Sequence, residues 1–275
     1  MRPEVQSRIT PFLQTVAQAP QSALLLDYDG TLAPFHARRD QAYPYPGVAL
    51  ILQEIVRNGR TRVVVITGRD ATDVLPLLNI HPRPEVWGGH GLQRLQTDGT
   101  MQMPHLDKRT LDALSDADRW LGSQQLRHTA EFKAGGIAVH WRGLSKHDAE
   151  DLRERVLIGW QRIAESSGLD LLEFDGGVEM RASEADKGDA VRTLLNEMSS
   201  HAPAAYLGDD ATDESAFRAM RGRGISMLVR PTQRRTAAQL WLQPPDELVD
   251  FLGQWLKTCA ERVASKSGAA ANMSG

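Results

Sequence analysis

Residues 22–31 read SALLLDYDGT, a short and almost wholly apolar run followed at once by Asp27 and Asp29. A run without alternation is typical of a strand buried on both faces, as in a parallel sheet covered by helices on each side. The segment therefore predicts a buried strand over residues 22–26. In open parallel sheets the ligand-binding crevice lies outside the carboxyl ends of the strands. Asp27 and Asp29 are thus placed where a functional site is expected.

The same pattern, an apolar run followed by polar residues, occurs twice more. Residues 62–66 precede Thr67-Gly68-Arg69, and residues 204–207 precede Gly208-Asp209-Asp210. Helical patterns separate such runs; the one over residues 46–59 starts at a proline and ends at a glycine. Strands that alternate with helices predict an α/β fold with a parallel sheet. Further elements of this kind are expected at 86–87 (strand), 187–198 (helix), 215–220 (helix), 225–229 (strand) and 240–241 (strand).

Between residues 104 and 181 the pattern changes from α/β to α+β. The spacing of apolar residues and an Asp-Gly turn predict two helices and two strand pairs in this segment. The elements are helix 107–121, strands 129–133 and 137–142, helix 148–166, and strands 171–174 and 178–181. Since the α/β pattern resumes afterwards, the segment is predicted to be an insertion.

The predicted division is therefore a core of residues 1–103 and 182–264 with an inserted module, 104–181. A length of 275 residues agrees with this, because single hydrophobic cores stop growing near 250–300 residues. The small and polar tail, 265–275, is expected to be disordered. Whether residues 2–21 form a helix on the core or a loose extension stays open.

Composition excludes several classes of protein. Lys and Arg total 32 against 35 Asp and Glu, so the basic excess that nucleic-acid and anionic-membrane binding need is missing. The single cysteine, Cys259, excludes an internal disulfide. No apolar run has the length of a transmembrane helix, and the first residues lack the build of a signal peptide. We expect a cytoplasmic monomer with a small-molecule ligand.

The polar clusters at the strand ends, with Lys187, offer carboxylates, a hydroxyl and an ammonium group in one place. Hard oxygen donors beside a phosphate suggest Mg²⁺. Each cluster alone is also compatible with a turn or a helix N-cap. Their joint occurrence at three strand ends is harder to explain by turns alone.

These clusters carry a resemblance to a known superfamily. Residues 27–32 (DYDGTL) resemble the DxDGT first motif of the haloacid dehalogenase (HAD) superfamily, while Thr67, Lys187 and residues 208–214 (GDDATDE) fit its other three motifs. The chain is more closely similar to trehalose-6-phosphate phosphatases. That likeness rests on residues 24–35 (LLLDYDGTLAPF), GDDATDE, Glu131-Phe132-Lys133 with His140-Trp141-Arg142, and Glu179-Met180-Arg181.

The resemblance implies a HAD-like Rossmannoid core with an inserted α+β cap domain, and a phosphatase mechanism. Asp27 would be the nucleophile and Asp29 the general acid and base. Thr67 and Lys187 would bind the phosphoryl group. Mg²⁺ would be held by Asp27, the Asp29 carbonyl and Asp209, with Asp210 and Asp213 acting through water. Candidate phosphate- and substrate-binding residues are Gly30, Gly68, Arg69, His90, Glu131, Lys133, Arg142 and Glu179.

Alternatives stay open at this point. The substrate could be another sugar phosphate, such as a glucosylglycerol, sucrose or mannosylglycerate phosphate. A sugar-phosphate binding protein without turnover is a different class, which the intact pair Asp27 and Asp29 argues against. A phosphomutase shares the first chemical step. His90 could be a structural turn residue, and the polar residues of the module could be the solvated face of a sheet.

Overall fold

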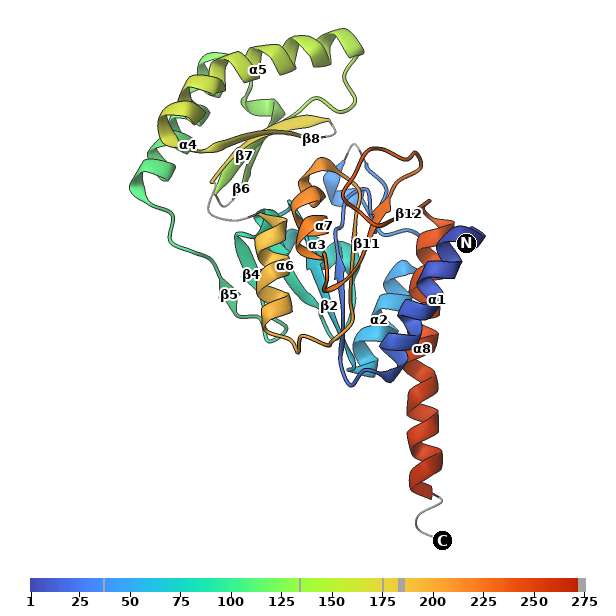
Figure 1. Ribbon diagram of the computed structural model, residues 1–275. Coiled ribbons are helices and arrows are strands. Elements are labelled where there is room, and N and C mark those ends of the chain that lie inside the picture. The colour runs from blue at the N-terminus through green and yellow to red at the C-terminus, as the bar shows by residue number, and fades with distance from the viewer. Residues whose placement is uncertain (37, 134, 175, 183–185, 272–275) are drawn as a thin grey trace.

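Strand β1 (Ser22–Leu26) lies inside an eight-stranded sheet of order β12-β11-β10-β1-β2-β3-β4-β5 in a computed structural model (Figure 1). The structure describes residues 1–36, 38–133, 135–174, 176–182 and 186–271, the last of these without the side chains of 261–271. The strands from β12 to β3 are parallel, and β4 and β5 continue the sheet antiparallel. Their bounds are β2 Thr61–Ile66, β3 Glu85–Gly88, β4 Gln93–Leu95, β5 Met101–Gln102, β10 Ala204–Gly208, β11 Gly224–Val229 and β12 Leu240–Leu242.

Helices cover both faces of this sheet, which explains the unalternating sequence of β1. Leu24 and Leu26 point into one apolar cluster, while Ala23 and Leu25 point into another on the opposite face. The first cluster includes α1 (Pro3–Gln18), α2 (Val48–Asn58), α3 (Ala71–Leu78) and α8 (Asp246–Ala271), and the second includes α6 (Lys187–Asn196) and α7 (Glu214–Ala219). The α/β fold with a parallel sheet is confirmed.

Several local predictions need adjustment. The helix predicted over 46–59 begins at Val48, because Gly47 before it has a left-handed backbone (φ 89°). Helix α3 and strands β4 and β5 were not predicted: α3 is short and contains Pro76, and the two strands have two or three residues each. The open question at the N-terminus is answered by α1, whose apolar side is buried against the core.

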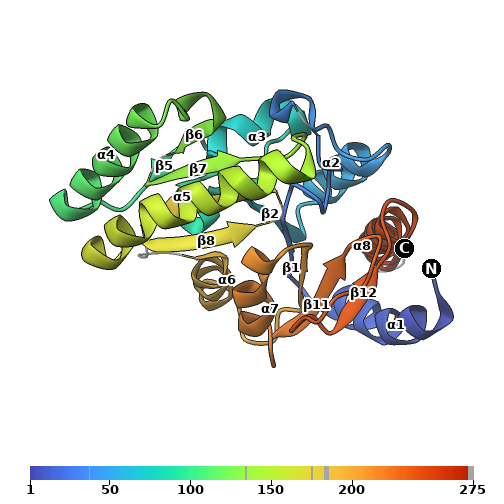
Figure 2. The ribbon, with the colours of Figure 1, turned by 90° about the horizontal axis from the view of Figure 1, so that it is seen from above.

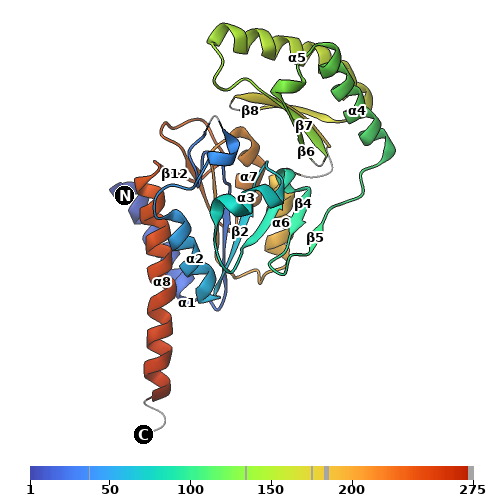
Figure 3. The same cartoon turned by 180° about the vertical axis from the view of Figure 1, so that it is seen from behind.

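Residues 108–181 build a second sheet with its own apolar core. The four antiparallel strands have the order β6-β7-β9-β8, and α4 and α5 lie side by side on one face of them (Figure 2). The other face is directed at the core sheet, as Figure 3 shows from behind. The bounds are α4 Lys108–Ser123, β6 Ala130–Lys133, β7 Gly136–His140, α5 Lys146–Ser167, β8 Asp170–Phe174 and β9 Gly177–Arg181.

The C-terminal segment differs from its expectation. Helix α8 continues to Ala271 and projects beyond the core, whereas disorder was expected from residue 265 (Figures 1 and 3). The alanines of this stretch favour a helical backbone. Some residues of the predictions lie outside the described residues. They are Ala134 and Asp175 in the predicted turns, Ser183 beside the predicted domain boundary, and residues 272–275 in the predicted tail. Within the described part of the chain, every helix is too short or too polar to span a bilayer.

Trp160 is expected to be a main support of the second sheet. Its side chain on α5 is fully buried in the module's apolar cluster, so Trp160→Ala should lower the free energy of unfolding by about 3–5 kcal/mol. Ile158 on the same helix is 67% exposed, and Ile158→Ala should change it by less than about 0.5 kcal/mol. Urea unfolding followed by circular dichroism measures both. Equal losses for the two variants would contradict the assignment of Trp160 to a packed core.

Candidate active site

The polar residues that follow β1, β2 and β10 come together because these strands are neighbours and parallel. Asp27, Thr67 and Asp209 line one cavity of about 510 Å³. Residues of the inserted module, among them Lys133 and Glu179, line the same cavity. The site therefore lies between the core sheet and the second sheet.

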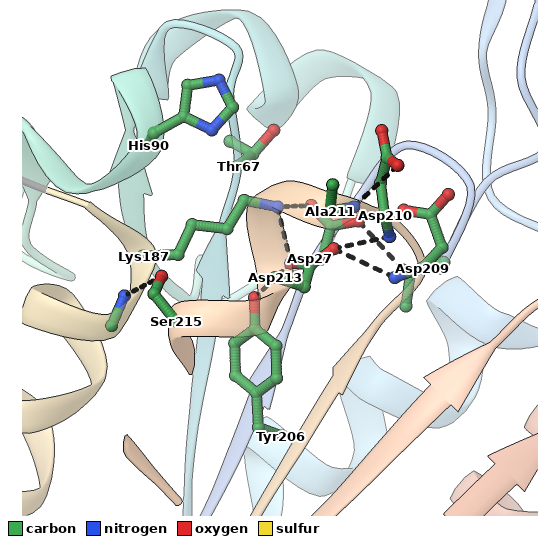
Figure 4. Close-up of polar contacts among 12 residues, drawn as sticks. Asp27, Thr67, His90, Lys187, Tyr206, Asp209, Asp210, Ala211, Asp213 and Ser215 are labelled. Carbon is green, nitrogen blue, oxygen red and sulfur yellow. Dashed lines mark hydrogen bonds and ion pairs between the residues drawn. The ribbon is translucent and has the colours of Figure 1, made fainter. Parts of the chain in front are cut away.

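Lys187, the first residue of α6, is a buried cation of this site. Its Nζ donates to Asp27 Oδ1 at 2.6 Å and to Asp213 Oδ1 at 2.7 Å (Figure 4). Burial by itself lowers the pKa of Lys187, but the two carboxylates raise it above its ordinary value. The ammonium group is therefore charged. Thr31 donates its hydroxyl to the other oxygen of Asp27 at 2.9 Å, so both carboxylate oxygens are held in place.

Asp213 accepts hydrogen bonds from four donors around the acidic cluster. Its Oδ1 accepts from Lys187 and from the Tyr206 hydroxyl at 2.5 Å, and its Oδ2 accepts from the backbone N–H groups of Asp209 and Asp210 at 3.0 Å each. These four donors occupy the acceptor positions of a carboxylate. These contacts position Lys187 and the 209–210 backbone, and the water-mediated metal contact of Asp213 stays a prediction.

Three carboxylates lie close together in the site. Oxygens of Asp27, Asp209 and Asp213 lie within 4.8 Å of one another. Burial, with the charge of Asp213, raises the pKa of Asp27 to about 7 although Lys187 opposes this, and burial raises the pKa of Asp209 as well. Oxygen-only donors with excess negative charge fit a hard divalent ion such as Mg²⁺.

Gly30 explains why the loop after β1 can come so close to Asp209. Its backbone is left-handed (φ 86°), and a Cβ there would lie 2.2 Å from Asp209 Oδ2. Both the conformation and the close approach require glycine. Gly30 was predicted to bind phosphate. It is not among the residues that line the cavity.

Asp29 is tied to Arg69 by a two-pronged ion pair. Arg69 Nε donates to Asp29 Oδ2 and Nη2 donates to Oδ1, both at 2.6 Å. The third nitrogen of the guanidinium, Nη1, donates to the backbone carbonyl of Arg39 at 2.8 Å. Arg69 was predicted to bind substrate, and the sequence did not indicate that it holds Asp29.

The polar residues of the module form pairs inside the cavity. Lys133 Nζ lies 3.1 Å from Glu179 Oε1, and both side chains are only 5% exposed. The solvated-face alternative does not apply to this pair. Burial alone raises the pKa of Glu179, but Lys133 and His90 hold it well below its usual range. Glu131 accepts from His140 at 2.8 Å and forms an ion pair with Arg39.

Arg142 makes a contact between the module and the core. Its guanidinium lies over the ring of Phe35, 4.1 Å from the centroid, in a cation–π arrangement. Most of the predicted site residues line the cavity with it: Asp27, Asp29, Thr67, Gly68, Arg69, His90, Glu131, Lys133, Glu179, Lys187, Asp209 and Asp210.

Three functional neighbours were missed by the sequence analysis: Thr31, Arg39 and Tyr206. Thr31 follows the aspartates directly and could have been assigned from its position in the motif. Tyr206 sits on β10, where an apolar run hides a hydroxyl. Arg39 lies in a short turn with no pattern of its own, so only the fold shows that it reaches Glu131.

Comparison with known proteins agrees with this geometry. The trehalose-phosphatase family model matches residues 25–246. The trehalose-phosphate phosphatase of Mycobacterium ulcerans (strain Agy99) is 28% identical over 254 residues, which cover 86% of this chain and 61% of that protein. The chain thus spans less than two thirds of this relative.

Solved structures share the fold. The C-terminal domain of the C. albicans trehalose-6-phosphate phosphatase superposes with a TM-score of 0.77 at 17% identity, covering 90% of this chain and 96% of that one. A haloacid dehalogenase-like hydrolase from B. subtilis gives 0.60 at 18% identity, covering 85% and 99%. With the HAD-like fold and a family match over most of its length, the chain belongs to the trehalose-phosphatase family.

Proposed function

We propose that this chain hydrolyses trehalose 6-phosphate to trehalose and phosphate through a phosphate ester of Asp27. The observation that carries the proposal is the placement of Asp27. Its carboxylate is held by Lys187 and Thr31 at the floor of a cavity that polar residues of the module close on the other side. The family to which the chain belongs supports the choice of substrate.

In the first step an oxygen of Asp27 forms a bond to phosphorus while the bond from phosphorus to the sugar oxygen breaks. Asp29 gives its proton to that leaving oxygen. In the second step water attacks phosphorus, gives its proton to Asp29, and the bond to Asp27 breaks. Lys187 and Thr67 stabilise the charge on the phosphoryl oxygens throughout.

Asp29 is paired with Arg69 in the position from which it would transfer the proton. Each of its oxygens accepts one hydrogen bond from the guanidinium and keeps a second lone pair, which can hold the proton. Mg²⁺, held by Asp27, the Asp29 carbonyl and Asp209, would supply the charge compensation that lets a carboxylate approach a phosphate dianion.

The inserted module, residues 104–181, would act as a cap on the core, 1–103 and 182–264. Its pairs Lys133–Glu179 and Glu131–His140 present charged donors and acceptors to the cavity. Such groups suit the hydroxyls of a sugar, and a cap that covers them excludes water.

Phosphate release from a panel of sugar phosphates, with and without Mg²⁺, tests the proposal. We expect the highest kcat/KM for trehalose 6-phosphate and no turnover without the metal. A strong preference for a sugar phosphate that is not a disaccharide would overturn the substrate. Binding of the panel without any release of phosphate would overturn the enzymatic function.

Metal binding is predicted to stabilise the fold. Saturating Mg²⁺, at about 100 times its Kd, contributes about 2.7 kcal/mol, which should raise the Tm by roughly 5 °C. Asp209→Asn should remove most of this rise, while Asp116→Asn on the exposed side of α4 should keep it. Differential scanning fluorimetry measures all three proteins. An equal rise in the Asp209 variant would exclude Asp209 as a ligand.

A further inference from the structure

The ring of His90 carries a buried nitrogen that has no hydrogen-bond partner among the residues the structure describes. This atom is Nδ1, and His90 lines the cavity. In Figure 4 it points to the side on which Thr67 and Lys187 lie, while Nε2 points away from them. Buried polar atoms are rarely left without a partner, so this one calls for an explanation.

The second ring nitrogen fixes which kind of partner Nδ1 can take. Nε2 lies 2.9 Å from Glu179 Oε2, and Glu179 Oε1 already accepts from Lys133. Because Glu179 is ionised and only accepts, Nε2 must carry the proton. Burial, together with Lys133, lowers the pKa of His90 to about 4 in spite of Glu179, so the ring is neutral. Nδ1 is therefore a bare acceptor.

The backbone holds the ring in this orientation at a cost. His90 has a left-handed conformation (φ 58°, ψ 23°), which is uncommon for a residue other than glycine, and its N–H donates to the Thr67 carbonyl at 2.9 Å. The ring packs on Gly68, where a Cβ would lie 2.5 Å from Nε2. Such strain persists where surrounding structure enforces it, often at functional sites.

We propose that Nδ1 of His90 accepts a hydrogen bond from a hydroxyl of the substrate's sugar. Glu179 is then a positioning residue, since its bond to Nε2 keeps the Nδ1 lone pair on the side of Thr67 and Lys187. A fully ionised phosphate has no proton to donate, so the phosphoryl group is not the partner. The inference rests on the proposed function, because it requires a hydroxyl-bearing phosphate ester in this cavity.

Two variants separate this role from a structural one. In His90→Asn the amide oxygen can take the place of Nδ1, but the reach to Glu179 is lost. In His90→Gln the amide nitrogen can take the place of Nε2 and keep the bond to Glu179, but the acceptor at Nδ1 is gone. Asparagine also tolerates the left-handed backbone. Melting temperatures establish that both variants fold.

For trehalose 6-phosphate we expect KM to rise about tenfold in His90→Gln with kcat close to that of the unmodified protein. His90→Asn should stay within about threefold of the unmodified KM. With p-nitrophenyl phosphate, which has no sugar hydroxyl, His90→Gln should raise KM by a smaller factor than with trehalose 6-phosphate. The proposal is overturned if His90→Gln keeps the KM of the unmodified protein and His90→Asn raises it. His90 would then serve to bridge the core and the module.

¹⁵N NMR of protein with labelled histidine measures the protonation of the His90 ring directly. It does not depend on whether His90→Gln folds. The His90 ring, assigned by its loss in His90→Asn, should show one unprotonated nitrogen whose shift changes when trehalose is added. Two protonated nitrogens, or no change with trehalose, would overturn the proposal. If the unmodified protein hydrolyses p-nitrophenyl phosphate but no sugar phosphate, the proposed function itself fails, whatever the variants show.

Discussion

Asp27→Asn should abolish phosphatase turnover, with a fall in kcat on the order of 10⁵-fold, as expected when a covalent nucleophile is removed. The amide is neutral and a poor nucleophile, yet it has the shape of the carboxyl group. Its oxygen can still accept from Lys187, and the Thr31 hydroxyl can rotate to accept from its nitrogen. The loss is thus expected without a change of fold, and phosphate release measures it.

Stability provides the control for Asp27→Asn. Because the folded-state pKa of Asp27 is raised to about 7, the fold favours its protonated form. This preference contributes to the free energy of unfolding below the ordinary pKa of an aspartate, and the contribution is lost as the pH rises through about 7. The neutral variant should therefore melt no lower than the metal-free unmodified protein at pH 8. Near-normal turnover in Asp27→Asn would refute the nucleophile, and a lower Tm would refute the charge argument.

The sheet could be predicted from the sequence because its central strands are buried on both faces. The runs that became β1, β2 and β10 are apolar at most positions, and polar residues follow where each strand reaches the crevice. Elements at the edge lack that constraint. Strands β4 and β5 pair only with their neighbours at the end of the sheet and have no pattern long enough to read.

The members of the candidate site could be predicted, but their partners could not. Asp29 and Arg69 each follow an apolar run, which marks both as crevice residues. That they bind each other depends on the register of β1 against β2 and on the rotamers of the two side chains. The bond from His90 to Glu179 joins residues 89 positions apart, one in the short 3-10 turn after β3 and the other on β9, and no local pattern encodes it.

Asp29→Asn should lower kcat for trehalose 6-phosphate by about 10²–10⁴-fold, the range for a lost general acid and base. A sugar alkoxide is a poor leaving group and needs the proton from Asp29. p-Nitrophenolate leaves readily without one, so the first step with p-nitrophenyl phosphate should be much less affected. The second step still needs a base to activate water. Rapid mixing should therefore show a burst of p-nitrophenol followed by slow turnover.

The comparison of substrates also separates proton transfer from the anchoring of Arg69. Asp29→Asn breaks the ion pair that holds the guanidinium at 2.6 Å, and a displaced Arg69 would disturb the phosphate site. Because the phosphoryl group is common to both substrates, that disturbance would slow both first steps by the same factor and leave no burst. An equal fall in the rate of the first step with both substrates would thus show that Asp29 serves to hold Arg69. A much larger fall with trehalose 6-phosphate than with p-nitrophenyl phosphate, together with a burst, would show that Asp29 transfers the proton.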